Sequence, residues 1–346
     1  MARQHIAHAL EIALSALILA GLFYVAFFVK PSVEVPDVRR SAIEPRDNFY
    51  GVASPGDDGA VVWAAGRAGK IIRSDDGGEH WRAQETPVFH HIQDIAAWDA
   101  DTAVAAGDQG TVLITQDGGG HWRSVDAPTR PRGGSQFLRV RIDTQGRAWI
   151  TGTMGVLLVS GDNGRSWRLT HPKQDIGWND VTVAPDGTVW LVGEFGTIKR
   201  SGDGGASWQA VDSPTDSSLM SVTFSDTDHA VAVGLSGTVL TTSDGGAHWQ
   251  RRQAGTGAHL FDVAWDGARY LAVGNGGVLV TGSADGGSWK AGSIAPGDFG
   301  WYTEVTPVAG HTYITGQTLG TLADGRWRAF RGRPAPGNDE EASRNG

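Results

Sequence analysis

The stretch SDDGGEHW, from Ser74 to Trp81, places acidic residues and two glycines shortly before a tryptophan. Similar stretches recur along the chain: TQDGGGHW ends at Trp122, SGDNGRSW at Trp167, SGDGGASW at Trp208 and TSDGGAHW at Trp249, and the shorter SADGGSW and LADGRW end at Trp289 and Trp327. The tryptophans that end these stretches are 41, 45, 41, 41, 40 and 38 residues apart. Seven copies at a spacing near 40 residues are typical of a repeat architecture.

The second repeat shows what one period contains. IQDIAAW at 92–98 alternates like a strand, and TAVAAG at 102–107 is a short apolar run that ends in glycine. TVLITQD at 111–117 and HWRSVD at 121–126 supply a third and a fourth strand. Four strands in one period of this length form one blade of a β-propeller. The sequence therefore predicts an all-β fold, a seven-bladed β-propeller with four antiparallel strands per blade.

The recurring box, Ser/Thr-x-Asp-x-Gly-x-x-Trp, is interpreted as a structural turn. Its aspartate can accept hydrogen bonds from backbone N–H groups of its own turn. A calcium-loop interpretation fails because the box lacks the further ligands and the terminal Glu of an EF-hand loop. We therefore expect no metal and no cofactor, and assign a structural role to five box residues: Asp76, Asp117, Asp162, Asp203 and Asp244.

Each repeat also carries paired glycines in its second turn. The first six repeats have Gly-x-x-Gly, which begins at Gly66, Gly107, Gly152, Gly193, Gly234 and Gly274, and the seventh has Gly316 and Gly320. Glycine supplies the positive φ that a tight hairpin needs. A phosphate-binding loop would be followed by a helix, so these glycines indicate hairpins instead.

The overall composition excludes several classes of function. The formal net charge is −9 and the pI is about 5.6, so nucleic-acid binding through a basic field is not expected. The chain has no cysteine, which excludes disulfides, thiol catalysis, Cys-based zinc sites and a lipid-modified N-terminal cysteine.

The N-terminus predicts a single transmembrane helix. Ile12 to Val29 contains no charged residue and, as a helix, is about 27 Å long, close to the hydrocarbon thickness of a bilayer. A signal peptide would end in small residues of the Ala-x-Ala kind, whereas this run ends in bulky ones, which favours an uncleaved anchor. The predicted organisation is an anchor at 1–30, a proline-containing linker at 31–47, the propeller at 48–331 and a disordered tail at 332–346.

The box and the paired glycines together resemble a known family. The box is the Asp-box, or BNR, repeat, and the joined pattern from about Phe49 to Phe330 is similar to the seven-bladed propellers of the photosystem II assembly and stability factor family. This resemblance implies a non-enzymatic propeller that helps a membrane protein assemble. Lipid-anchored members use a cysteine, which this chain lacks, and it has the apolar N-terminal run instead.

The resemblance also implies a partner and a location. Similar anchored propellers in non-photosynthetic bacteria are often encoded beside RND-type (MMPL) exporters, so the expected partner is an integral membrane protein such as a transporter of that type. The propeller is expected on the periplasmic side of the inner (cytoplasmic) membrane. The positive-inside rule opposes this orientation, because several basic residues follow the apolar run: Lys30, Arg39, Arg40 and Arg46.

Sialidases also carry Asp-boxes, which raises the possibility of an enzyme. Catalysis by sialidases uses a Tyr nucleophile, an Asp acid and three converging arginines. Beyond the apolar run the available tyrosines are Tyr50, Tyr270, Tyr302 and Tyr313. Four arginines directly follow box tryptophans, on outer strands expected far from the axis: Arg82, Arg123, Arg168 and Arg328. We therefore predict no catalytic residue, and keep a glycan- or ligand-binding propeller and a sialidase-like hydrolase as alternatives.

Alignment of the first strands brings one set of polar residues to the same position. These innermost strands line the central channel, so an acidic ring with one arginine is expected at its mouth, either to cap backbone donors or to bind a cation. The aligned residues are Gly51, Asp94, Arg139, Asp180, Ser221, Asp262 and Glu304.

A partner-binding face is predicted from exposed aromatic and arginine residues. Loops that enter the first strands share one face with the Gly-x-x-Gly turns, and the Asp-box turns lie on the opposite face. Aromatic rims commonly mark protein interfaces. The residues expected to dock a partner are Phe89, His91, Arg130, Arg132, Arg139, Trp178, Phe299 and Trp301.

Overall fold

The computed structural model describes residues 13–21, 23, 41–56, 58–128, 135–170 and 175–330. The chain divides into two units, residues 1–40 and residues 41–346. In the first unit, residues 13–21 and 23 are helical. Within the described part of the chain, no helix has both the length and the apolar character needed to cross a membrane. The rest of the predicted anchor, residues 31–40 of the predicted linker and the predicted tail lie outside the described residues, so the anchor stays a prediction.

The second unit is built from antiparallel strands. Each repeat supplies four of them, in the order that the second repeat predicts. In chain order, the strands are β1 Phe49–Ala53, β2 Val62–Gly66, β3 Ile71–Ser74, β4 Arg82–Gln84, β5 Ile92–Ala97, β6 Ala103–Gly107, β7 Thr111–Thr115, β8 Arg123–Ser124, β9 Phe137–Ile142, β10 Ala148–Gly152, β11 Val156–Ser160, β12 Arg168–Leu169, β13 Trp178–Val183, β14 Val189–Gly193, β15 Ile198–Ser201, β16 Gln209–Val211, β17 Leu219–Phe224, β18 Ala230–Gly234, β19 Thr238–Thr242, β20 Gln250–Gln253, β21 Leu260–Trp265, β22 Tyr270–Gly274, β23 Val278–Gly282, β24 Trp289–Ser293, β25 Tyr302–Val308, β26 His311–Gly316, β27 Gly320–Ala323 and β28 Arg326–Ala329.

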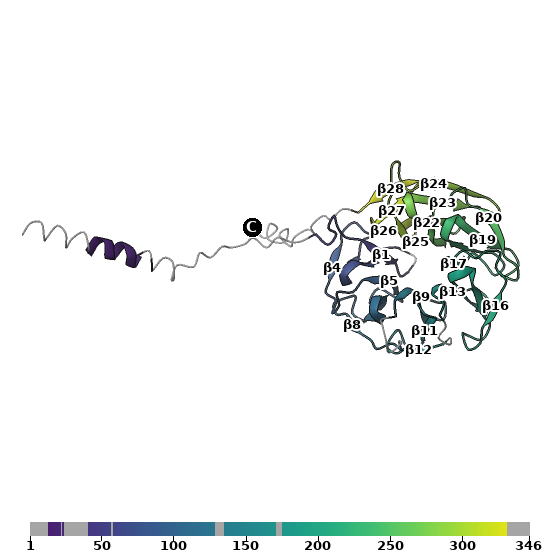
Figure 1. The fold of residues 1–346 in the computed structure, drawn as a ribbon, viewed down its shortest axis with the longest axis horizontal. Coiled ribbons are helices and arrows are strands. Elements are labelled where there is room, and N and C mark those ends of the chain that lie inside the picture. Colours follow the sequence, from purple (N-terminus) through teal and green to yellow (C-terminus); the bar gives the residue numbers. More distant parts are fainter. Residues whose placement is uncertain are drawn as a thin grey trace, which may run out of the picture. The chain divides into compact units, whose positions relative to one another are not determined.

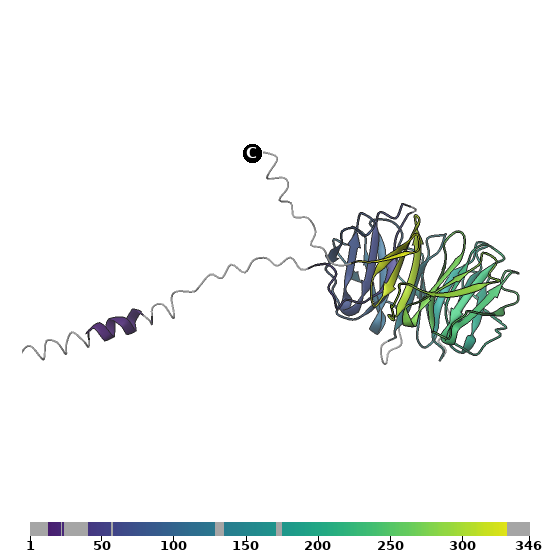
Figure 2. The same cartoon turned by 90° about the horizontal axis from the view of Figure 1, so that it is seen from above.

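These strands form six sheets arranged around a ring. Five sheets have four strands each, in sequence order, and the sixth has eight strands contributed by the first and last repeats. The first strand of each repeat lies towards the centre of the ring and the fourth lies at its outer edge (Figure 1). Figure 2 shows the ring from the side, with the strands running between two opposite faces. The all-β, propeller-like fold that the repeats predict is therefore confirmed.

The second strands of the first six repeats are buried along their whole length, and in β26 of the seventh only His311 is exposed, because these strands pack against neighbouring sheets on both sides. The strand β10, for example, has five buried residues out of five. In one core cluster, Val104 and Ile114 of the second repeat pack with Phe137 of the third. Short apolar runs such as AVAAG and AWITG are expected for strands that are covered on both faces.

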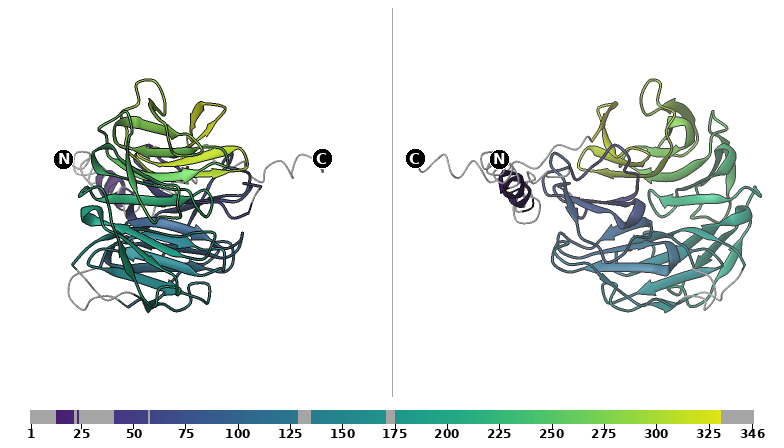
Figure 3. Two further views of the ribbon diagram at one scale, coloured as in Figure 1. Left: turned by 90° about the vertical axis from the view of Figure 1, so that its right-hand side faces the viewer. Right: turned by 60° about the vertical axis from the view of Figure 1, so that its left-hand side comes forward.

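The ring closes where the first and last repeats meet (Figure 3), and among the described strands each of these two repeats pairs its own four. Strands β1 and β26 share a single backbone pair, Phe49 with Gly316. Side chains complete the seam: Thr303 Oγ1 donates to Tyr50 O at 2.8 Å, and Arg328 donates to Glu79 at 2.7 and 2.9 Å.

The chain joins this unit before the predicted boundary at residue 48. Ala42 is buried in the core cluster that contains Phe49, and Asp47 forms an ion pair with Lys70. Residues 41–47, predicted as part of the linker, therefore belong to the strand-containing unit.

The Gly-x-x-Gly turns are short 3-10 helices in five repeats. Their third residue is a glycine with positive φ, and at Gly196 an added Cβ would lie 1.8 Å from Thr215 O. Their second residue also has a left-handed conformation, as Phe195 does with φ 56°. These turns are η1 Arg67–Gly69, η2 Asp108–Gly110, η3 Glu194–Gly196, η4 Leu235–Gly237 and η5 Asn275–Gly277.

The Asp-box forms a hydrogen-bonded turn in which the buried group is the hydroxyl. Asp203 accepts from Ser207 N at 2.9 Å and from Ser207 Oγ at 2.6 Å, and these bonds lower the pKa of Asp203 to about 2. Ser201 is buried, donates to Asp203 at 2.7 Å and accepts from Gly205 N at 2.8 Å. The same pattern surrounds the other four box aspartates.

Replacing Ser201 with alanine is expected to lower the free energy of unfolding by about 1–3 kcal/mol, because the buried Gly205 N–H loses its acceptor. The matched control is Ser207→Ala, which removes an exposed hydroxyl from the same box and is expected to cost less. Urea denaturation of both variants measures the difference. Equal losses would show that the buried hydroxyl has no special role.

Candidate functional site

The two faces of the ring differ in their turns. On one face, which we call the strand-start face, the 3-10 turns contact the segments that enter the next first strand. Ala68 N donates to His91 Nδ1 at 3.0 Å, and Ser236 N donates to His259 Nδ1 at 2.9 Å. On the opposite face, the Asp-box face, Gly118 N of a box donates to Asp101 O at 3.0 Å.

Exposed large apolar side chains of the second unit collect on the strand-start face. Phe89 precedes β5 and is 88% exposed, and Phe299 precedes β25 and is 85% exposed. Phe195, in the turn η3, is 70% exposed. Among the described residues, the other exposed large apolar side chains belong to the N-terminal helical segment. Sequence reasoning identified Phe89 and Phe299 but missed Phe195, although the phenylalanine inside GEFG at 193–196 was a visible signal.

An aromatic cluster lies on this face beside the centre of the ring. Tyr50 stacks on Trp301 with ring centroids 5.8 Å apart and an interplanar angle of 28°. The His91 ring meets Tyr50 edge-on at 6.0 Å. All three side chains are partly buried, so part of each ring stays accessible. Other partly exposed residues hold the same position in their first strands as Tyr50: Gln93, Leu138, Met220, Phe261 and Thr303.

One position further along the first strands, the predicted ring of polar residues is buried rather than exposed at the channel mouth. The carboxylates accept backbone N–H groups from the next repeat's first strand. Val140 N donates to Asp94 at 2.9 Å, and Val305 N donates to Asp262 at 2.9 Å. Corresponding bonds link Val222 N to Asp180 at 3.1 Å and Val52 N to Glu304 at 2.7 Å. The carboxylates thus join neighbouring repeats, the last to the first included.

Two arginines of β9 reach these carboxylates across the channel. Arg139 donates to Asp262 Oδ1 at 3.1 Å and to the carbonyl oxygens of Phe261 and Thr303 at 3.1 and 3.0 Å. Arg141 donates to Glu304 at 2.8 Å and also pairs with Asp180 and Asp262. We call Arg139, Arg141 and the four carboxylates the ion network. Arg141 was not expected in this ring because it lies two residues after the aligned position, although alternation in a strand puts residues 139 and 141 on one side.

Burial sets the electrostatics of the ion network. Desolvation raises the pKa of Asp94, and desolvation together with the Asp94 charge raises the pKa of Glu304 to about 8. Burial opposes the charge on Arg141, yet the surrounding carboxylates raise its pKa well above the usual value. Burial therefore favours the protonated form of Asp94 and Glu304 beside an arginine that stays charged.

Several predicted docking residues are placed elsewhere by the structure. Trp178 is 0% exposed and packs in a core cluster with Trp149 and Leu191, so its predicted contact with a partner is wrong. Arg139 is 7% exposed and belongs to the ion network, so its predicted docking role is also wrong. Phe89, His91, Phe299 and Trp301 do lie on the strand-start face. Arg130 and Arg132 lie outside the described residues.

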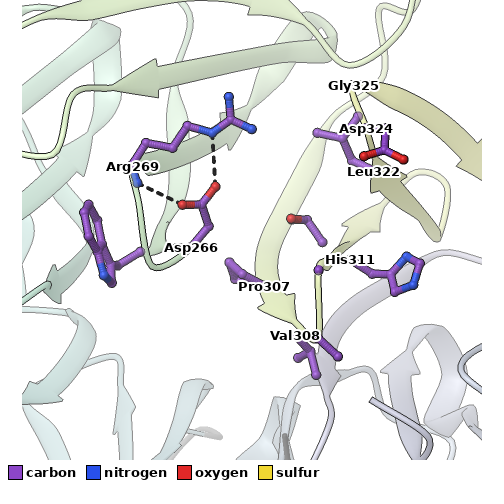
Figure 4. A pocket seen from close by; sticks show the side chains of 12 residues that line it. Asp266, Arg269, Pro307, Val308, His311, Leu322, Asp324 and Gly325 are labelled. Atoms are coloured by element: carbon purple, nitrogen blue, oxygen red, sulfur yellow. Dashed lines mark hydrogen bonds and ion pairs between the residues drawn. The ribbon is translucent and has the colours of Figure 1, made fainter. Parts of the chain in front are cut away.

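A cavity of about 320 Å³ opens on the other side, among loops of the sixth and seventh repeats (Figure 4). Its lining includes Trp265, Asp266 and His311, and Asp266 pairs with Arg269 at 3.1 Å. Within the described parts of the chain, no group of three or more His, Asp or Glu residues could hold a metal ion.

A ring of antiparallel sheets built from four-stranded repeats that carry an Asp-box defines the class of BNR-repeat β-propellers. The family model described as photosynthesis system II assembly factor YCF48 matches residues 79–172 and 206–300, which together are more than half of the chain. The chain belongs to this family.

Solved structures confirm the fold. The structure described as YCF48 bound to D1 peptide is 16% identical, with a TM-score of 0.65 over 79% of this chain and 91% of that one. YCF48 from Cyanidioschyzon merolae is 16% identical, with a TM-score of 0.64 over 84% and 98%. A streptogramin B lyase is 14% identical, with a TM-score of 0.67 over 81% and 94%. No curated protein matches the chain.

Proposed function

We propose that this protein is a non-enzymatic, membrane-anchored propeller that acts as an assembly factor or accessory subunit of a membrane protein complex. The observation that carries the proposal is the gathering of accessible aromatic side chains on one face of a propeller of the YCF48 family. One structural relative of that family is bound to a peptide of D1. By analogy, this chain binds an exposed segment of a membrane protein.

The aromatic cluster of Tyr50, His91 and Trp301 is the proposed contact for that segment. Its rings offer stacked, partly accessible surfaces at the first-strand end of the channel. Beneath it the ion network crosses the channel, so a bound segment lies over the mouth and does not thread through. A few central aromatic anchors can supply most of the affinity of such an interface.

The finer features of the proposal concern architecture and location. The eight-stranded sheet counts as two blades, one from the first repeat and one from the last, which gives seven blades. Ile12 to Val29 anchors the chain in the inner membrane, with the propeller on the periplasmic side and an RND/MMPL-type transporter as partner. The uncharged run and the helical residues 13–21 support the anchor. Anchoring would raise the effective concentration of the propeller near a membrane partner.

Replacing Trp301 with alanine is expected to reduce recovery of an integral membrane partner about tenfold or more, the loss typical of a central aromatic anchor. The full-length protein is purified from its native membrane in mild detergent, and the co-purified proteins are quantified by mass spectrometry. The matched control is Trp265→Ala, because Trp265 is also partly buried but lies on the Asp-box face, against Tyr270. If Trp265→Ala loses the partner and Trp301→Ala retains it, the interface lies on the Asp-box face and the proposed contact is wrong.

Protease added to spheroplasts is expected to degrade the propeller, because the proposed location is outside the cytoplasm. An antibody against the C-terminal half follows the domain, and a cytoplasmic protein that stays intact reports that the cells are sealed. Survival of the propeller in sealed spheroplasts, with digestion only after lysis, would reverse the proposed orientation.

A further inference from the structure

The three exposed phenylalanines described in the second unit lie around the channel on the strand-start face. Phe89 lies before the second repeat's first strand, Phe195 in the fourth repeat's turn, and Phe299 before the seventh repeat's first strand. Because repeats succeed one another around the ring (Figure 1), these positions are spread around it and do not form one patch.

The carboxylates beside two of these rings are turned towards the protein. Asp298, next to Phe299, accepts hydrogen bonds from Gly300 N at 2.7 Å and from Tyr302 OH at 2.6 Å. Glu194, next to Phe195, accepts from Gly177 N at 2.7 Å. With their neighbouring carboxylates engaged in this way, the exposed ring edges present apolar surface outward.

The N-terminal chain approaches β1 along the same face. Arg67 N of the turn η1 donates to Asn48 O at 3.0 Å, and Asp47 pairs with Lys70 directly after that turn. Between the apolar run, which ends at Val29, and the second unit, which begins at Ser41, lie 11 residues. Even fully extended they span no more than about 40 Å. A membrane that holds the run is therefore within reach of the strand-start face.

We propose that the strand-start face rests on the lipid bilayer, with Phe89, Phe195 and Phe299 entering the headgroup region as a tripod. The inference rests on the proposed anchor and adds a lipid contact to the proposed function. A bilayer surface contacts widely spaced rings at once, and moving apolar rings from water into it is favourable. The three rings carry no charge, so the proposed contact is apolar and suits a neutral bilayer. The aromatic cluster beside the channel then faces whatever segment of a membrane protein projects from the bilayer.

The chain's lack of cysteine makes a direct test possible. Single variants Phe89→Cys, Phe195→Cys and Phe299→Cys of the full-length protein are labelled with an environment-sensitive dye and reconstituted into phosphatidylcholine vesicles that hold no other protein. Ala247→Cys, an exposed position on the Asp-box face, carries the same dye as the matched control. Quenching by a lipid-borne nitroxide is expected to be at least about threefold stronger at the three tripod positions than at the control, since only they meet the headgroup region.

A second comparison tests whether the rings act together. With Phe195→Ser and Phe299→Ser added, the label at Phe89→Cys is expected to lose most of its lipid quenching. If the protein floats with the vesicles while lipid quenches the three labels no better than the control label, the tripod is overturned. That result would favour a protein partner for this face. A chain that does not float would overturn the proposed anchor and the tripod together. The co-purification experiment with Trp301→Ala tests the binding of a membrane protein partner independently of the quenching and flotation results.

Discussion

Replacing Arg139 with methionine is expected to lower the free energy of unfolding by about 3–5 kcal/mol, the usual loss when one partner of a buried ion pair is removed. The methionine fills similar space but leaves Asp262 without one of its donors. The carbonyl oxygens of Phe261 and Thr303 lose the guanidinium as well. Urea denaturation followed by tryptophan fluorescence measures the loss.

Two further variants make the result specific. Arg123→Met, on the exposed outer strand β8, is expected to change the free energy of unfolding by no more than about 0.5 kcal/mol. Adding Asp262→Asn to Arg139→Met is expected to restore part of the loss, because the uncompensated carboxylate is then neutral. If Arg139→Met unfolds at the wild-type midpoint, the arginine does not hold the repeats together across the channel.

Raising the pH from about 5 to about 8 is expected to destabilise the protein, and Glu304→Gln is expected to remove much of that dependence. The pKa of Glu304 is raised from 4.5 to about 8 by burial and by the nearby Asp94 charge. Between these values the folded protein binds a proton that the unfolded chain has released, so rising pH favours unfolding. The stabilisation is fully present below the unfolded pKa and is lost as the pH passes the folded pKa.

Other carboxylates also make the stability of the protein depend on pH. Burial also raises the pKa of Asp94, which adds to the same trend. The Asp-box carboxylates Asp117, Asp203 and Asp244 have a pKa of about 2, so their stabilisation is present above the unfolded pKa and is lost only in acid.

The measurement is the urea midpoint at several pH values between 5 and 8 and at constant ionic strength. Glu79→Gln is the control, because Glu79 is exposed and its pKa is lowered by Arg328, which confines its effect to acid. Parallel curves for the wild type and Glu304→Gln would show that Glu304 is ionised throughout this range.

The sequence by itself determined the features that depend on residues close along the chain. The recurrence of the box, with a tryptophan about every 40 residues, predicts the repeats, and alternation within each repeat predicts its strands. The hydrogen bonds of an Asp-box link residues no more than four positions apart, such as Asp203 and Ser207. Short-range signals of this kind are written into the local sequence, so the turn and the strands around it could be predicted without a structure.

Tertiary structure alone decided which of the equivalent residues are accessible and which pairs meet across the ring. Trp178 and Trp301 are two tryptophans at the start of first strands. Trp178 begins its strand and packs between sheets, whereas Trp301 precedes its strand and stays partly exposed. Arg139 meets Asp262 at a separation of 123 residues and Thr303 O at 164. Burial and charge pairing depend on distances in space, and closing the ring brings these residues together at its centre.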